Sequence, residues 1–99
     1  MNLQKCVDET AIFFELYKRF TRIVNFLYDN KLVQAHQELQ RISSEFLQLG
    51  KKPEELMKMV VTNISDIVSN VRSGAVIQAY FGSREMLQLI SDKIKINAK

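Results

Sequence analysis

Residues 32–49 read LVQAHQELQRISSEFLQL and show the periodicity on which the fold prediction depends. Apolar residues recur here at alternating intervals of three and four, which places them on one narrow face of an α-helix. They are Leu32, Ala35, Leu39, Ile42, Phe46 and Leu49. A narrow apolar face is typical of helices that pack at shallow angles in bundles. The stretch therefore predicts an amphipathic helix that ends near Gly50, a residue suited to the left-handed conformation after a helix.

Three further segments show helical periodicity, over about residues 8–29, 53–72 and 75–94. The connections between the four segments are short, so consecutive helices should be antiparallel neighbours. No segment alternates apolar and polar residues for long enough to predict a strand. The sequence therefore predicts an all-α protein whose 99 residues form one domain, a four-helix antiparallel up-and-down bundle.

Turn and capping residues stand at the ends of these segments. Asp8 or Thr10 is placed to cap the first helix, and Asp29-Asn30 is a turn signal after it. Pro53 is placed in the first turn of the third helix, where its missing N–H costs nothing.

The fourth segment contains the pair Gly82-Ser83, at which a helix could kink or break. Apolar residues keep a common helical phase across the pair. They are Val76, Tyr80, Leu87, Ile90 and Ile94. We expect one helix, with a kink or break at the pair as the alternative.

The composition excludes several classes of protein. The formal net charge is +3, but the charges alternate in sign and form no long basic stripe, so nucleic-acid binding is not indicated. Cys6 is the only cysteine, which excludes an internal disulfide and a cysteine-based zinc site. The start of the chain lacks the apolar run of a secretory signal, and no stretch approaches the roughly 20 apolar residues of a membrane span. We therefore expect a cytoplasmic protein without a cofactor.

Residues that could carry out catalysis are few. His36 is the only histidine, and it has no second metal ligand at helical spacing. The three glycines stand apart, so no phosphate-binding loop is formed, and we expect no enzymatic activity. His36 should lie at the margin between the apolar and polar faces of its helix. Two roles remain open for it, packing or partner contact at this margin, and phosphoryl transfer as in histidine phosphotransfer domains.

The first helix carries more apolar side chains than one buried face accommodates. On a helical wheel with Ile12 at 0°, the core face covers about 0–120°. Tyr17 and Tyr28 extend this face to about 160°, and Phe14 lies at about 200°. Phe26 lies at about 320°, among polar residues. These polar residues are Glu15, Lys18, Arg19, Arg22 and Asn25. Either two neighbouring helices grip a wide face, or the extra aromatic residues form a docking surface for another apolar helix.

Two short motifs stand in the first two predicted helices. Leu16-Tyr17 is a Leu-Tyr pair in the first helix, and Ala35, His36, Leu39 and Arg41 read Ala-His-x-x-Leu-x-Arg in the second. These motifs resemble those of the flagellin-export chaperone family, and the resemblance covers about residues 9–49. It implies a small helical bundle that shields the amphipathic end of a secretion substrate and holds it monomeric until export.

These observations predict a non-enzymatic protein-binding module, a small cytoplasmic chaperone or adaptor that shields an amphipathic helix of a secretion or assembly partner. The expected contacts are Phe14, Tyr17, Phe26 and Tyr28, with His36 as a polar or packing residue beside them. Self-association into a homodimer would use the same edge. One alternative is a histidine phosphotransfer protein that uses His36, and another is a small basic helical immunity or inhibitor protein.

Overall fold

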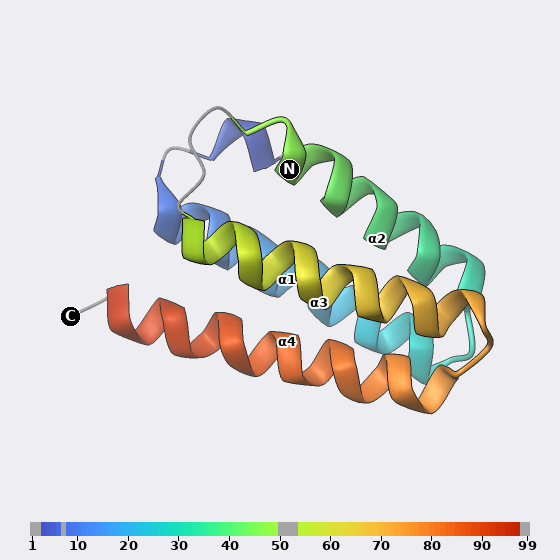
Figure 1. Cartoon of the computed structure of the whole chain (residues 1–99). Helices are drawn as coiled ribbons and strands as arrows, with labels where there is room; N and C mark the ends of the chain where they lie inside the picture. Colours follow the sequence, from blue (N-terminus) through green and yellow to red (C-terminus); the bar gives the residue numbers. More distant parts are fainter. Residues whose placement is uncertain (1–2, 7, 50–53, 98–99) are drawn as a thin grey trace.

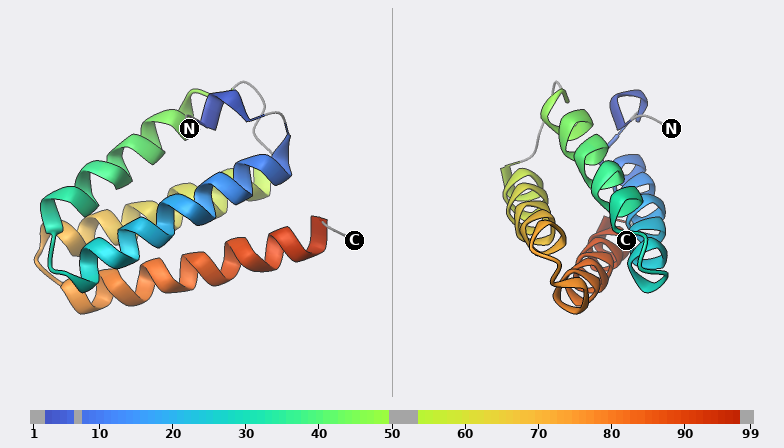
Figure 2. Two further views of the ribbon diagram at one scale, coloured as in Figure 1. Left: turned by 180° about the vertical axis from the view of Figure 1, so that it is seen from behind. Right: turned by 90° about the vertical axis from the view of Figure 1, so that its right-hand side faces the viewer.

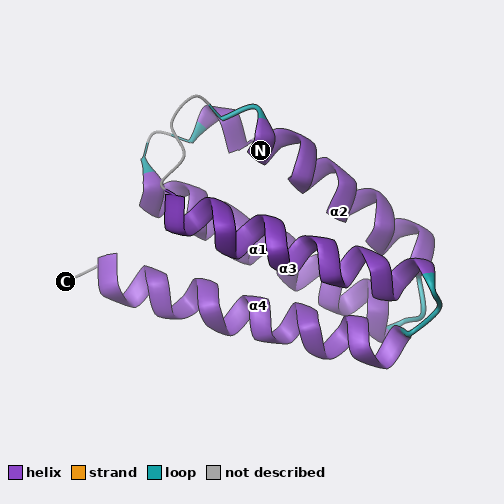
Figure 3. Cartoon of the chain, viewed as in Figure 1, coloured by secondary structure: helices purple, strands orange, loops and turns teal. Residues whose placement is uncertain are grey.

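The computed structural model describes residues 3–6, 8–49 and 54–97, and they form a bundle of helices (Figures 1 and 3). The elements are η1 (Leu3–Lys5), a single 3₁₀ turn, and the α-helices α1 (Glu9–Tyr28), α2 (Leu32–Leu47), α3 (Glu54–Arg72) and α4 (Val76–Asn97). No strand occurs within these ranges. The predicted all-α class and the four predicted helices are confirmed.

The four helices lie in chain order around a common core. Viewed end on, they occupy the corners of a quadrilateral, and each helix packs against the next (Figure 2). α4 packs back against α1, and this is the most extensive of the four interfaces. α2 leans away from the other helices towards its C-terminal end, where η1 packs against it (Figure 1). The arrangement is the predicted antiparallel up-and-down bundle.

Local chemistry sets the ends of the helices. The Asp8 carboxylate accepts a hydrogen bond of 2.8 Å from the amide of Ala11, so Asp8 is the N-cap of α1. Asn30 follows α1 with φ +59°, a left-handed conformation that asparagine tolerates. Gly74 follows α3 with φ +77°, where a residue with a Cβ would be strained. Both residues let the chain reverse direction within a short connection.

α2 ends at Leu47, two residues before the last apolar residue of its predicted stripe. Gly50 and Pro53, which were expected to end α2 and to open α3, lie outside the described residues. α4 is continuous through Gly82 and Ser83, so the expected single helix is confirmed and no break occurs at the pair. The Ser83 hydroxyl donates to the carbonyl of Ala79 one turn earlier, which keeps its polar group satisfied inside the helix.

The core contains apolar residues from all four helices and from η1. Its largest fully buried side chains are Leu3, Phe13, Leu16, Phe20, Ile23, Leu27, Leu39, Ile42, Phe46, Ile67, Met86 and Ile90. The stripe predicted for the second helix is confirmed, since four of its members are buried and Leu32 and Leu49 pack against them at the margin.

The buried face of α4 differs from the predicted one. Of the expected residues only Ile90 is buried, and Val76, Tyr80, Leu87 and Ile94 lie at the margins. The buried face is formed instead by Ala79, Ser83, Met86 and Ile90. Small residues allow the close approach of α4 to its neighbours, and a periodicity based on large apolar residues does not detect them. Gly82 contributes to this fit, because a Cβ there would lie 3.3 Å from Cγ1 of Ile67 in α3.

Candidate functional site

Three of the aromatic residues predicted to bind a partner share one exposed face of α1. Phe14, Tyr17 and Tyr28 are 58%, 41% and 79% exposed. Tyr17 follows Phe14 by three residues and precedes Tyr28 by eleven, which is about three turns, so all three side chains lie on one side of the helix. Large apolar groups gathered on one exposed face favour an interaction with another molecule.

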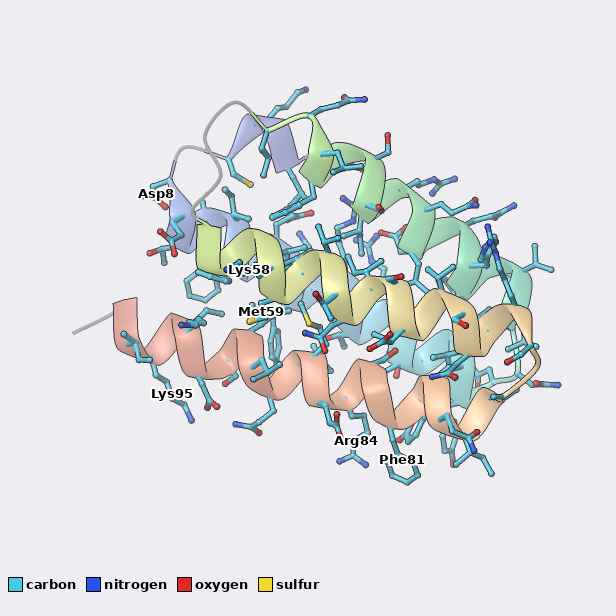
Figure 4. All side chains as sticks on the ribbon, viewed as in Figure 1. Asp8, Lys58, Met59, Phe81, Arg84 and Lys95 are labelled. Atoms are coloured by element: carbon cyan, nitrogen blue, oxygen red, sulfur yellow. The ribbon has the colours of Figure 1, made fainter. Side chains whose placement is uncertain are left out.

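The exposed aromatic face continues from α1 onto α4. The rings of Tyr28 and Tyr80 have centroids 6.4 Å apart, and Tyr80 contacts Phe81 edge-on at 5.7 Å. The Arg84 guanidinium lies 5.7 Å from the Tyr80 ring centroid, within the range of a cation–π contact. Figure 4 shows Phe81 and Arg84 next to each other on the outer side of α4. We call Phe14, Tyr17, Tyr28, Tyr80 and Phe81 the aromatic strip.

Tyr80 and Phe81 were not predicted from the sequence to be surface residues. Tyr80 was assigned to the core face of the fourth helix, and it lies half-buried at its margin. Phe81 is 55% exposed. Two consecutive aromatic residues in a helix point about 100° apart, so at most one of them lies at the centre of a narrow apolar face, and this signal could have predicted an exposed ring.

Two hollows lie on either side of Tyr17. The hollow on the outer face of α1 has a volume of about 820 Å³ and is lined by Ala11, Phe14, Glu15, Tyr17, Lys18, Thr21 and Arg22. The second hollow lies between α1 and α4, has a volume of about 190 Å³, and is lined by Tyr17, Arg84, Leu87, Gln88 and Ser91. The surface around Tyr17 is therefore indented, and side chains of a partner would fit on both sides of the ring.

Phe26 and His36 lie away from the aromatic strip. Phe26 follows Arg19 by seven residues and so lies on the α2 side of α1, where it is half-buried against the core. His36 is half-buried in α2, and its Nε2 accepts a hydrogen bond of 3.4 Å from Nε of Arg72 in α3. This contact engages the lone pair that a nucleophilic imidazole would use. The geometry gives both residues roles in packing helices together.

A second apolar surface lies between α2 and α3. It is a groove of about 980 Å³ in which Leu47 and Val61 are 55% and 43% exposed. Serines line much of the remainder, and Arg72 is the only charged residue among its described lining residues. The groove has no aromatic side chain among those residues. The groove therefore serves as a control surface for the aromatic strip, since it exposes apolar side chains without aromatic ones among its described lining residues.

A buried ionic network joins α1 to α2. Nε of Arg19 donates to Glu38 at 2.5 Å, and Nη1 of the same side chain donates to Glu45 at 2.6 Å. The backbone amide of Leu3 donates to the same Glu45 carboxylate at 2.9 Å. Arg19 and Glu38 are only 5% and 6% exposed. Helical periodicity places Arg19 and Glu15 among the polar residues of α1, and the structure shows that both are buried, with Arg19 held against α2.

The network sets the ionisation of its members. Burial by itself would raise the pKa of Glu45, but hydrogen bonds from Arg19 and from the Leu3 amide hold that pKa below its usual range. Burial would likewise lower the pKa of Arg19, and the hydrogen bonds to Glu45 and Glu38 raise it instead. Both groups are therefore held in their charged forms, and the arrangement fixes the position of α2 and η1 on α1.

Acid should weaken the attachment of α2. Folding lowers the pKa of Glu45, so the ionised carboxylate stabilises the folded state. This stabilisation is complete above the pKa of the unfolded chain, about 4.3, and is lost as the pH falls through the lower pKa of the folded protein. We expect Glu45→Gln to lower the free energy of unfolding by about 1.5–3 kcal/mol at pH 7. The difference from the wild type should shrink as the pH falls below about 4.3. Urea unfolding at a series of pH values measures it, and parallel profiles for the two proteins would contradict this role.

The part of the chain that the structure describes contains neither a candidate metal-binding cluster nor a candidate membrane span. None of the described residues forms a group of three or more His, Cys, Asp or Glu side chains that could hold a metal ion. Over the same residues, no helix has the length and apolar character needed to cross a membrane. The single cysteine, Cys6, is half-buried, and this burial, followed by the nearby Glu15 carboxylate, raises the pKa of its thiol. A reactive thiolate is therefore disfavoured there.

The residues that resemble motifs of the flagellin-export chaperones lie at the core or at its margin, or are exposed, as their positions on an amphipathic helix predict. Leu16 is buried and Tyr17 is exposed, while Ala35 and Leu39 are buried beside the half-buried His36. These positions are compatible with the resemblance but are not specific to it. No protein-family model matches the chain, and neither a curated protein nor a solved structure shows significant similarity to it.

Proposed function

We propose that this protein is a non-enzymatic binding module, a small cytoplasmic chaperone or adaptor whose aromatic strip takes the apolar face of a helix from a secretion or assembly partner. The observation that carries the proposal is the exposure of Phe14, Tyr17 and Tyr28 on one face of α1. The face extends over about 21 Å, since 14 residues separate its ends at about 1.5 Å per residue. This length matches about four turns of a partner helix.

Such binding needs no chemistry beyond burial. Removing apolar surface from water stabilises a complex by about 25 cal/mol per Å², and aromatic rings present large areas with few rotatable bonds. The ring contacts between Tyr28, Tyr80 and Phe81 hold part of the strip in place before a partner arrives. Pre-ordering of this kind reduces the entropy lost on association.

Replacing Tyr17 and Tyr28 together with serine tests the proposal. We expect the double variant to lose its partner in a pull-down from the native host, with captured proteins identified by mass spectrometry. The helical circular-dichroism signal should remain, because neither side chain belongs to the buried core. A matched control is the pair Val33→Ser and Leu47→Ser, which removes two exposed apolar side chains from α2. The control variant should retain the partner.

Three outcomes would argue against the proposed use of the strip. Equal capture by the wild type and both variants would show that the strip does not bind. Loss of capture only in the α2 control would assign binding to the exposed surface of α2 that contains Val33 and Leu47. If the wild type is a dimer by size-exclusion chromatography and the strip variant is a monomer, the strip serves self-association.

A further inference from the structure

The charged residues at the edges of the aromatic strip are mostly cations. Beyond its first turn, the exposed charged residues of α1 are Lys18 and Arg22, and both line the hollow next to Phe14 and Tyr17. On the other side of Tyr17, Arg84 of α4 lines the second hollow. Lys95 follows Arg84 by eleven residues, about three turns, and Figure 4 shows both side chains projecting from the outer side of α4.

Carboxylates are placed elsewhere or are already engaged. Glu15 lies beside the strip but is buried, 3.5 Å from Lys18. Glu85 and Asp92 lie about 60–100° further round α4 than Arg84 and Lys95, on the side away from α1. Glu85 lines the hollow between α3 and α4 together with Phe81, so the Phe81 end of the strip has an exposed carboxylate beside it. Asp92 accepts a hydrogen bond of 2.9 Å from Gln88. The exposed charged residues that line the hollows on both sides of Tyr17 are therefore cations, although the whole chain has a net charge of only +3.

We propose that the partner of this strip is an acidic amphipathic helix, with carboxylates on both sides of its apolar face. The inference rests on the proposed function and specifies the chemistry of the partner. Carboxylates on the two edges of the partner would face Lys18 and Arg22 on one side and Arg84 and Lys95 on the other. Complementary charge of this kind selects partners and accelerates association. The hollows beside Tyr17 receive side chains that project from a helix, which distinguishes this partner from a flat anionic membrane surface.

Two designed helical peptides of about 18 residues test the inference, with identical Leu and Ala faces and either Glu or Lys at the flanking positions. We expect the wild-type protein to bind the Glu peptide at least about tenfold more tightly in fluorescence anisotropy, because several surface charge pairs each add a small amount. Raising NaCl from about 50 mM to about 500 mM should reduce this preference, since salt screens exposed charges.

Charge-reversed variants make the test specific to the strip. The pair Arg22→Glu and Arg84→Glu should abolish or invert the preference for the Glu peptide. The pair Lys58→Glu and Arg72→Glu, two exposed residues of α3, which contributes no residue to the strip, should retain it. Both variants change the net charge equally, from +3 to −1, because each substitution replaces a positive charge with a negative one. Circular dichroism establishes that all the proteins are folded.

The outcomes separate this inference from the proposed function. If the protein binds both peptides equally, and the two tyrosine substitutions abolish both interactions, the strip binds helices but the acidic partner is wrong. If it binds neither peptide, the inference and the proposed function of the strip both fail. Sedimentation with vesicles that contain phosphatidylserine, without binding of either peptide, would assign the strip to a membrane surface instead.

Discussion

Replacing Arg19 with methionine is expected to lower the free energy of unfolding by about 3–5 kcal/mol, because two carboxylates would lose their cation between packed helices. Glu38 and Glu45 both accept hydrogen bonds from the guanidinium, and all three side chains are at least four-fifths buried. Methionine preserves much of the apolar stem and removes only the charge and the donors. Thermal unfolding followed by circular dichroism measures the loss, which corresponds to roughly 12–24 °C in Tm for a domain of this size.

Two further variants isolate the electrostatic cause. Arg22→Met alters an exposed arginine of the same helix and should change the free energy of unfolding by at most about 0.5 kcal/mol. Adding Glu38→Gln and Glu45→Gln to Arg19→Met removes the uncompensated charges and should restore part of the lost stability. If Arg19→Met alone costs less than about 1 kcal/mol, the network does not hold α2 against α1.

The helices and their order could be predicted from the sequence because each apolar stripe is long and regular. The stripe of α2 is the clearest case, since its spacing alone predicts the buried positions of Leu39, Ile42 and Phe46. The N-cap at Asp8 and the turn at Asn30 also follow from local chemistry. Short connections between such helices leave few arrangements other than an antiparallel bundle.

The features that the sequence did not predict depend on contacts between helices. Periodicity assigns Arg19 to a polar face, and only the position of α2 shows that this face is covered. The buried face of α4 includes Ala79 and Ser83. Their small side chains let α4 pack closely against its neighbours, but they add little to the apolar periodicity of the sequence. Leu3 belongs to none of the four predicted helices, and it is fully buried, with its amide bonded to Glu45.

The candidate site likewise contains features set by one helix, which the sequence predicts, and features that depend on two packed helices. Phe14, Tyr17 and Tyr28 were placed on one edge by spacing within a single helix, and they share an exposed face in the structure. The extension to Tyr80 depends on how α4 lies against α1, and the packing of Phe26 depends on α2. Positions within one helix are therefore predictable from the sequence, whereas a surface formed by two helices requires the packed structure.

Phe20→Ala and Phe14→Ala form a matched pair that separates the core from the proposed binding surface. The two phenylalanines lie in the same helix, but Phe20 is fully buried and Phe14 is 58% exposed. Phe20→Ala should lower the free energy of unfolding by about 3–5 kcal/mol, because it loses buried apolar surface and leaves a cavity. Phe14→Ala should change it by at most about 0.5 kcal/mol. Urea unfolding monitored by circular dichroism measures both.

Binding should respond in the opposite way to stability. Phe14→Ala should weaken binding of the Glu peptide while its unfolding curve stays close to that of the wild type. Phe20→Ala should bind nearly as well as the wild type at temperatures where it remains folded, because its side chain does not reach the surface. If Phe14→Ala instead destabilises the protein as much as Phe20→Ala does, Phe14 contributes to folding and the strip loses its free N-terminal end. The aromatic residues of α1 would then be core residues, as the alternative interpretation of the sequence has it.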